Sequence, residues 1–161
     1  MSNQNFAYVI KLILVFSMFG VLSACAVKSQ LIGSKWVVVG NIEIAPMKAG
    51  VFYQAGKPVA AISGDQYAPW CHLVFKDKVD KFRTIKSGSY EITKVVFYNE
   101  AVFSNQVTYK TRMTLSSTEP VQIIEMTCGN WDDNTGSYLT HEQLQQAMHG
   151  VMKLEIAPQT K

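Results

Sequence analysis

The chain has 161 residues, a formal net charge of +3, and a composition that is 48% hydrophobic and 17% charged. Such a composition is typical of a folded globular protein, and a positive charge this small and scattered argues against nucleic acid as a partner. Three histidines at irregular spacing do not form a metal-binding pattern, and neither a phosphate-binding loop nor a nucleophile elbow occurs in the sequence. We therefore expect no catalytic residues, no metal, no cofactor and no enzymatic activity.

The N-terminal residues have the order of an export signal. A polar start that includes Lys11 is followed by a largely apolar run, Leu12–Leu22. This run is about half of the ~20 residues that a membrane-spanning helix needs, so we interpret it as the apolar part of a cleavable signal peptide. It ends in Leu22-Ser23-Ala24-Cys25, which resembles the lipobox of bacterial lipoproteins.

This resemblance implies that residues 1–24 are removed as a signal peptide and that Cys25 receives a diacylglycerol and a further acyl chain such as palmitate. Two or three acyl chains hold a protein firmly at a membrane. The residue two positions after the cysteine is Val27 and not aspartate, which by the same resemblance implies the outer membrane of a Gram-negative bacterium. We expect residues 25–33 to be the lipidated N-terminus and tether of a cell-envelope protein. The alternative is an ordinary secretory signal that ends near an unmodified cysteine.

Residues 34–161 are expected to form a single β-rich domain, since their number is typical of one core. In Gln106–Ser116, apolar side chains including Val107, Met113 and Leu115 fall on one parity, which indicates a strand with one buried face. Turn residues between the strands predict an antiparallel sheet that curls into a sandwich or small barrel, a mainly β fold with one C-terminal helix. The other strands are predicted at Trp36–Ile44, Val51–Tyr53, Pro58–Ile62, Tyr90–Tyr98, Val121–Cys128 and Val151–Ile156.

Four aromatic residues, Phe52, Tyr53, Tyr67 and Trp70, lie in a stretch that also contains glycine and proline. Aromatic side chains in such a stretch usually pack in the core or at its rim. They are also favoured in binding surfaces, because tyrosine and tryptophan combine apolar area with a hydrogen-bonding group. Because loops on a rigid β scaffold often carry function, we treat these four residues as a candidate partner-binding set.

Two cysteines remain when Cys25 is assigned to lipid, and an even number in an oxidising compartment predicts a disulfide between Cys71 and Cys128. Closing a loop of this length should stabilise the fold by roughly 4 kcal/mol. The alternative, a reactive Cys71 paired with His72, is disfavoured because adjacent strand residues face opposite ways. Strand alternation places both cysteines on apolar faces, whose other members are Leu73, Phe75, Ile124 and Met126.

The most highly charged segment is Lys76–Arg83, in which basic and acidic residues alternate. A solvated hairpin turn is the simpler interpretation of this pattern. A patch that docks on anionic headgroups or glycans is the alternative.

A helix is predicted from His141 to His149. Thr140 and Gln143 match a capping box, and Gly150 follows the last turn, where a left-handed residue commonly ends a helix. The helix should pack on the sheet through a narrow apolar stripe formed by Leu144, Ala147, Met148 and Val151.

The order of several short motifs is distinctive. Ile42–Pro46 is followed by Val51–Gly56, by Tyr67 four residues before Cys71, and by a terminal helix with the motif Leu-Thr-x-x-Gln at its start. Together with the strand that leads to Cys128, this order resembles a group of uncharacterised Gram-negative envelope lipoproteins of similar length. The resemblance implies one β-rich domain with a disulfide, and it implies no activity.

These features favour a non-catalytic lipoprotein that binds an envelope protein near the outer membrane. The short tether limits how far the domain reaches, and the aromatic loops offer a surface for a partner. The alternative function is a lipid or glycan carrier, or a hydrolase, with a pocket inside a β-barrel. A large apolar cavity with convergent polar groups would support that alternative, and a filled interior would count against it.

Overall fold

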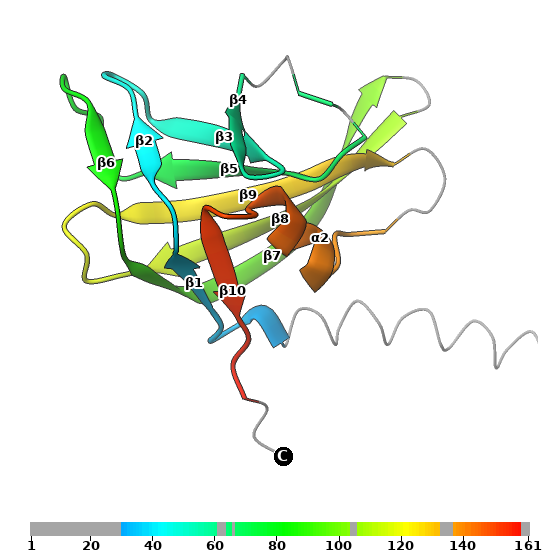
Figure 1. Ribbon diagram of the computed structural model, residues 1–161. Coiled ribbons are helices and arrows are strands. Elements are labelled where there is room, and N and C mark those ends of the chain that lie inside the picture. Colours follow the sequence, from blue (N-terminus) through cyan, green and yellow to red (C-terminus); the bar gives the residue numbers. More distant parts are fainter. Residues whose placement is uncertain (1–29, 61–63, 66, 104–105, 133–136, 159–161) are drawn as a thin grey trace, which may run out of the picture.

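The computed structural model describes residues 30–60, 64–65, 67–103, 106–132 and 137–158 (Figure 1). The lipobox and Val27 lie outside the described residues. The described chain is mainly β, with one short helix, α2 (His141–Ala147). The strands are β1 (Lys35–Val38), β2 (Ile42–Ile44), β3 (Gly50–Gln54), β4 (Lys57–Val59), β5 (Trp70–Phe75), β6 (Arg83–Ile85), β7 (Ser89–Phe103), β8 (Gln106–Ser116), β9 (Ile123–Asp132) and β10 (Met152–Glu155).

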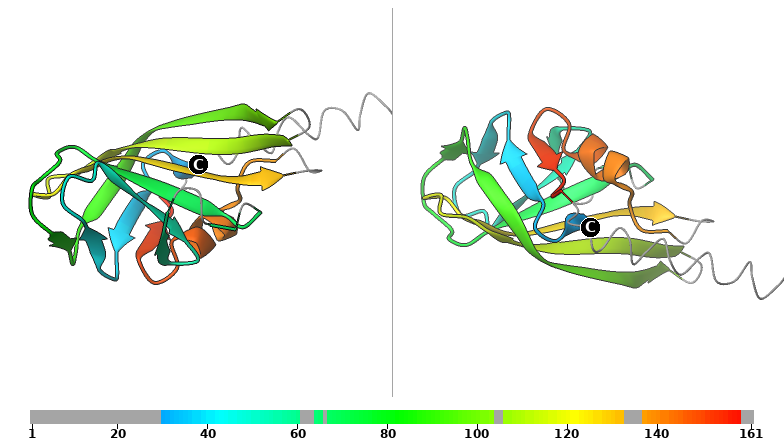
Figure 2. Two further views of the ribbon diagram at one scale, coloured as in Figure 1. Left: turned by 90° about the horizontal axis from the view of Figure 1, so that it is seen from above. Right: turned by 90° about the horizontal axis from the view of Figure 1, so that it is seen from below.

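Eight strands form one strongly curled sheet in the order β10-β1-β7-β8-β9-β5-β3-β4, and every neighbouring pair is antiparallel. Strands β2 and β6 pair separately as a two-stranded sheet at one end of the molecule (Figure 1). The large sheet has the shape of a half-barrel, and α2 lies on its concave side (Figure 2). The prediction of an antiparallel, curled, mainly β fold with one C-terminal helix is confirmed.

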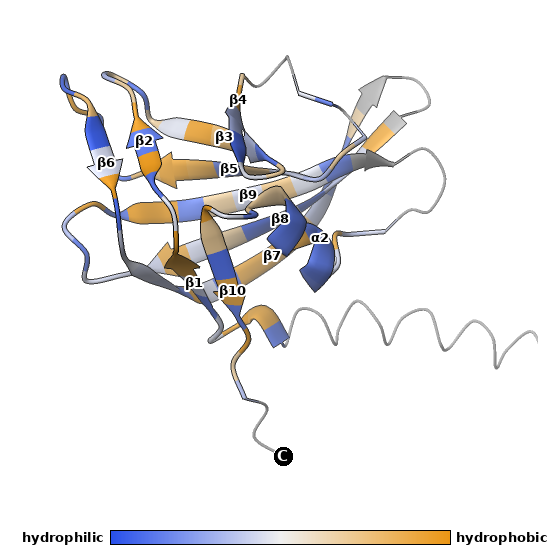
Figure 3. Ribbon diagram, in the orientation of Figure 1, coloured by the Kyte–Doolittle hydropathy of each residue, from blue (hydrophilic) through white to orange (hydrophobic). Residues whose placement is uncertain are grey.

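The core lies between the concave face of the sheet and α2. In β5 the burial alternates strictly, with Cys71, Leu73 and Phe75 buried and the residues between them partly exposed. Alternation of hydrophobic and hydrophilic residues is visible along β2 and β10 (Figure 3). Leu144 and Met148 from the helix segment belong to the same buried cluster. Because side chains alternate across a strand, the opposite, convex face of the sheet carries the polar and aromatic residues described below.

The helix begins where the sequence predicts. Thr140 is the N-cap, its hydroxyl accepts a hydrogen bond from Gln143 N, and the Gln143 side chain accepts one from Thr140 N. This reciprocal capping box satisfies two amides that an α-helix leaves without partners. The helix ends two residues earlier than predicted, with Met148 as the C-cap, and Gly150 has the expected left-handed conformation at φ 70°.

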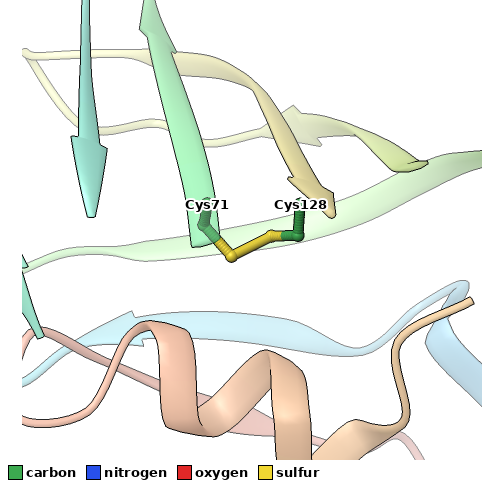
Figure 4. The surroundings of a disulfide bond; sticks show 2 residues. All are labelled: Cys71 and Cys128. Atoms are coloured by element: carbon green, nitrogen blue, oxygen red, sulfur yellow. A yellow bond between two sulfur atoms is a disulfide. The ribbon is translucent and has the colours of Figure 1, made fainter. Parts of the chain in front are cut away.

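The disulfide between Cys71 and Cys128 is present and joins directly opposed residues of β5 and β9. Both cysteines are fully buried. Figure 4 shows the bond on the side of the sheet where α2 lies. Leu73, Phe75 and Met126 share this buried face as expected, but Ile124 does not. The register shifts between Val74 and Phe75, so Ile123 is buried and Ile124 is 38% exposed.

Other predicted boundaries also differ from the structure. The strand predicted at Trp36–Ile44 is divided into β1 and β2. Between them, Gly40 passes so close to the backbone of Gly150 that a Cβ atom would lie 2.2 Å from the Gly150 carbonyl oxygen. The domain also begins before residue 34, since Leu31 is fully buried in the core and Gly33 N donates to Ile92 O. The last residues of the expected tether are therefore part of the folded domain.

Candidate functional site

Aromatic and cationic side chains gather on the convex face of the large sheet. The register pairs Trp70 with Gly129, Gly129 with Lys110, and Lys110 with Tyr98, so these positions form one row across β5, β9, β8 and β7. A second row runs from Phe52 through His72 and Thr127 to Arg112. We call the six aromatic or basic residues of these rows the aromatic–cationic face: Phe52, Trp70, His72, Tyr98, Lys110 and Arg112.

Trp70 and Lys110 meet above a glycine. A Cβ atom on Gly129 would lie 2.9 Å from Tyr109 O, 3.1 Å from the Trp70 ring and 3.2 Å from the Lys110 side chain, so a larger residue here would crowd the backbone and both side chains. The Lys110 ammonium is 5.9 Å from the ring centroids of both Trp70 and Tyr98, within the range of cation–π attraction. Lys110 also pairs with Glu100, which holds its charge on this face.

Arg112 is fixed over the Tyr98 ring. Its guanidinium carbon is 4.8 Å from the ring centroid, and Nη2 donates to the Tyr98 hydroxyl at 3.1 Å. The hydrogen bond to Tyr98 raises the pKa of Arg112, and Glu125, 3.6 Å from Nε, acts in the same direction. The side chain is still 46% exposed, so the cation is positioned and accessible at the same time.

Phe52 connects the two rows. Its ring stacks on the His72 imidazole with centroids 4.0 Å apart and lies 5.8 Å from the Trp70 ring. Burial lowers the pKa of His72 below its ordinary value of 6.5, although the nearby Glu125 carboxylate opposes this shift. At neutral pH the imidazole is therefore uncharged and acts as a third flat ring beside Phe52 and Trp70.

A loop borders the face next to Trp70. The Gln54 side chain accepts a hydrogen bond from Asp65 N at 2.8 Å and donates to Ala68 O at 2.9 Å, so one amide ties two positions of the loop to the end of β3. Tyr67 lies on this loop, and it is 56% exposed. The loop is therefore tied to the sheet at Gln54, the register partner of Trp70, and it carries an exposed aromatic residue.

The four aromatic residues selected from the sequence fall in three different places. Phe52 and Trp70 lie together on the convex face, and Tyr67 lies on the bordering loop. Tyr53 is 2% exposed and belongs to the core. Neighbouring residues of a strand point to opposite sides, so Phe52 and Tyr53 cannot serve the same surface, and Tyr53 is removed from the set.

The sequence-based set did not include His72, Tyr98, Lys110 and Arg112. The alternation in β8 did place Lys110 and Arg112 on the hydrated parity. What the sequence lacks is the register that sets them beside Trp70 and Tyr98, because the strand order places β8 next to β9 and β9 next to β5.

Comparisons with known proteins add no relative: no family model, no curated protein and no solved structure matches this chain. Among the described residues, no group of three or more histidine, cysteine or acidic side chains is placed to hold a metal ion. In the same part of the chain, no helix is long and apolar enough to cross a membrane. The candidate site therefore rests on its own geometry.

Proposed function

We propose that this chain is a non-catalytic envelope lipoprotein that binds a protein partner through the aromatic–cationic face. The observation that carries the proposal is the assembly of four rings and two cations, from four strands, on the face of the sheet opposite the core. Aromatic residues and arginine are enriched in protein interfaces and dominate their binding energy. The β scaffold and the contacts among these side chains reduce the entropy lost when a partner binds.

The exposed cation of the face, Arg112, favours an acidic group on the partner. Lys110 and Arg112 each contact one glutamate, Glu100 and Glu125 respectively, and the Arg112 side chain remains 46% exposed. A carboxylate on the partner would bind Arg112 in a charge-assisted hydrogen bond. An aromatic or aliphatic side chain of the same partner would pack on Phe52 and Trp70.

The proposed anchor limits where this partner lies. Because Leu31 is already in the core, the chain between Cys25 and the domain has about five residues, which span less than ~20 Å when extended. A protein tethered so closely is restricted to partners at the same membrane surface, and the outer membrane is the membrane that we propose.

The alternative function, a carrier or hydrolase with an internal pocket, has less support. The concave side of the sheet is packed with large side chains that are fully buried, including Trp36, Tyr90 and Met113. A ligand inside the half-barrel would have to displace such residues. A binding function at the surface requires no such rearrangement.

Site-specific photocrosslinking in living cells tests the proposal. A photoreactive phenylalanine analogue at position 67, beside the face, should give one discrete protein adduct that mass spectrometry identifies. Position 39 provides the matched control, because Val39 and Tyr67 are both 56% exposed and Val39 lies beyond the end of β1. Trp70→Ala and Arg112→Glu should each reduce the adduct at position 67 at least tenfold. Equal adducts at both positions, or adducts insensitive to these substitutions, would contradict a partner at this face.

The anchor is tested in the same cells. Cys25→Ala should abolish metabolic labelling with a palmitate analogue, and the labelled residue in the unsubstituted protein should be Cys25. The adduct at position 67 should be lost with the anchor if the partner lies at the membrane. Labelling that survives Cys25→Ala would show that this cysteine is not the lipidated residue.

A further inference from the structure

A second exposed surface lies at the end of the two-stranded sheet. Ile44, the last residue of β2, is paired there with Arg83, the first residue of β6. The loop that follows β2, residues 45–49, and the loop that precedes β6, residues 76–82, come together at this end. Met47 N donates to Val79 O at 2.7 Å, which joins the two loops directly. We call these two loops the loop tip; they lie at the upper left of Figure 1.

The loop tip carries the two large hydrophobic side chains with the highest fractional exposure among the described residues. Phe82 is 77% exposed and Met47 is 66% exposed. Met47 has φ 60°, a left-handed conformation that a non-glycine residue rarely adopts, and the hydrogen bond to Val79 holds it there. The fold therefore maintains an unfavourable backbone conformation at a position where an apolar side chain points to solvent.

Basic residues surround these two side chains. The two loops and the first residue of β6 contain five basic residues and two acidic ones, which leaves a local excess of three positive charges. The basic residues are Lys48, Lys76, Lys78, Lys81 and Arg83, and the acidic ones are Asp77 and Asp80. The four lysines are exposed, and none of them forms a salt bridge with another described residue. Arg83 has a different role, since its Nη2 donates to Asp77 O at 2.7 Å and shapes the loop.

We propose that the loop tip binds the surface of a bilayer rich in anionic phospholipids. Phe82 and Met47 enter the interfacial region, and Lys48, Lys78 and Lys81 contact the headgroup phosphates. Exposed apolar side chains within a basic surface are the combination that binds such interfaces, because insertion and electrostatic attraction add. A merely hydrated turn would account for the charges but not for the two apolar side chains held outward.

This site is separate from the aromatic–cationic face. Strand β5 runs from Trp70, on that face, to Phe75, after which the chain enters the loop tip. The loop tip is also on the side of the molecule away from residues 30–34, which lie near the bottom of Figure 1. It can therefore meet a lipid surface other than the one that holds the N-terminus.

The test uses the full chain reconstituted in vesicles of neutral phosphatidylcholine, which are then mixed with dye-labelled vesicles that carry no protein. Flotation and immunocapture of the first vesicles measure how many labelled vesicles are bound. Labelled vesicles with 30% phosphatidylglycerol, a proportion set by the experimenter at roughly that of an anionic membrane, should be captured at least tenfold more than neutral ones. The capture should fall steeply as salt is raised, because charges are screened.

Two variants assign the capture to the loop tip. Lys78→Glu/Lys81→Glu should lower it about tenfold, and Phe82→Ser should lower it severalfold without changing its salt dependence. The control Lys57→Glu/Lys94→Glu makes the same charge change at two exposed lysines outside the loop tip and should leave capture unchanged. Equal capture of neutral and anionic vesicles would overturn the proposal, as would equal losses in the two double variants. The crosslink at position 67 is independent of all these outcomes.

Discussion

Gly56 shows how one residue links two parts of the fold. It lies in the turn between β3 and β4, directly after Ala55. Both residues have left-handed φ angles, 74° for Gly56 and 49° for Ala55. The Gly56 N–H donates at 3.0 Å to the carbonyl oxygen of Ala147, which is the last residue of α2. A Cβ atom added to Gly56 would lie 1.8 Å from His149 O. The turn between β3 and β4 thus contacts the end of the helix, and only glycine fits at position 56.

We predict that Gly56→Ala lowers the free energy of unfolding by about 3 kcal/mol or more, because a left-handed conformation and a backbone collision act together. Gly150→Ala is the matched control: Gly150 has φ 70°, but nothing lies within 4 Å of the place that an added methyl group would take. That substitution should cost only about 1 kcal/mol. Urea titration of the two variants measures both values, and equal losses would show that the contact with His149 contributes nothing.

His72 makes stability depend on pH in one direction. Burial lowers its pKa below 6.5, so the folded state favours the neutral imidazole. As pH falls, the unfolded chain therefore binds a proton at His72 before the folded chain does. The free energy of unfolding has its full value from this residue above about pH 6.5, and that stability is lost as pH falls through the folded-state pKa. We predict that the wild type loses more stability than His72→Gln between pH 7.5 and 5.5, as measured by urea denaturation. Identical pH profiles would contradict the prediction.

At the level of elements, α2 protects an edge of the sheet. Strand β10 is the outermost strand, and an edge strand exposes N–H and C=O groups that can pair with another chain. Gln145 from the helix donates to Met152 O at 2.8 Å and accepts from Leu154 N at 2.7 Å. Its side-chain amide thus takes the place of one peptide group of a neighbouring strand.

We predict that Gln145→Ala destabilises the fold by about 1 to 3 kcal/mol, since two backbone groups lose their partners. It should also increase self-association, because the freed edge can pair with another copy. The control is Gln146→Ala, on the exposed side of the same helix. Denaturation and analytical ultracentrifugation measure the two effects, and a variant that stays as stable and as monomeric as the control would exclude an edge-protecting role.

Elements with strong local patterns were predictable, whereas those that depend on distant contacts were not. The capping box at Thr140 and the strand Gln106–Ser116 follow from local spacing and match the structure. The close approach of Gly40 to Gly150 and the register shift that leaves Ile124 exposed both involve distant parts of the chain. Neither contact leaves a trace in the local pattern. The same limit applies to the aromatic–cationic face, whose members come from four strands.

On the scale of the molecule, the disulfide joins two residues that are far apart in the sequence but adjacent in the folded sheet. Cys71 and Cys128 are 57 residues apart in the sequence but directly opposed in the sheet, with Cα atoms 4.0 Å apart. The bond adds little to a strand pair that already has its hydrogen bonds. Its contribution comes from the unfolded chain, where it restricts the segment that contains β6, β7 and β8.

We predict that Cys71→Ser/Cys128→Ser lowers the free energy of unfolding by roughly 4 kcal/mol under oxidising conditions. The wild type in a reducing buffer should approach the same lower stability, and Cys25→Ala should match the oxidised wild type. Thermal and urea denaturation provide the comparison. An unchanged midpoint in the double variant would show that the crosslink is not a source of stability.

The pairing of β1 has a consequence for the timing of folding. β1, at the start of the described chain, lies between β7 and β10, and Lys35 pairs with Glu155 near its end. Strand β1 can gain its second neighbour only after residues 152–155 have been synthesised, and contacts between such distant residues form late. This delay suits the export that we propose. An emerging polypeptide that stays unfolded can be threaded through a translocation channel, and it acquires its final shape only on the far side.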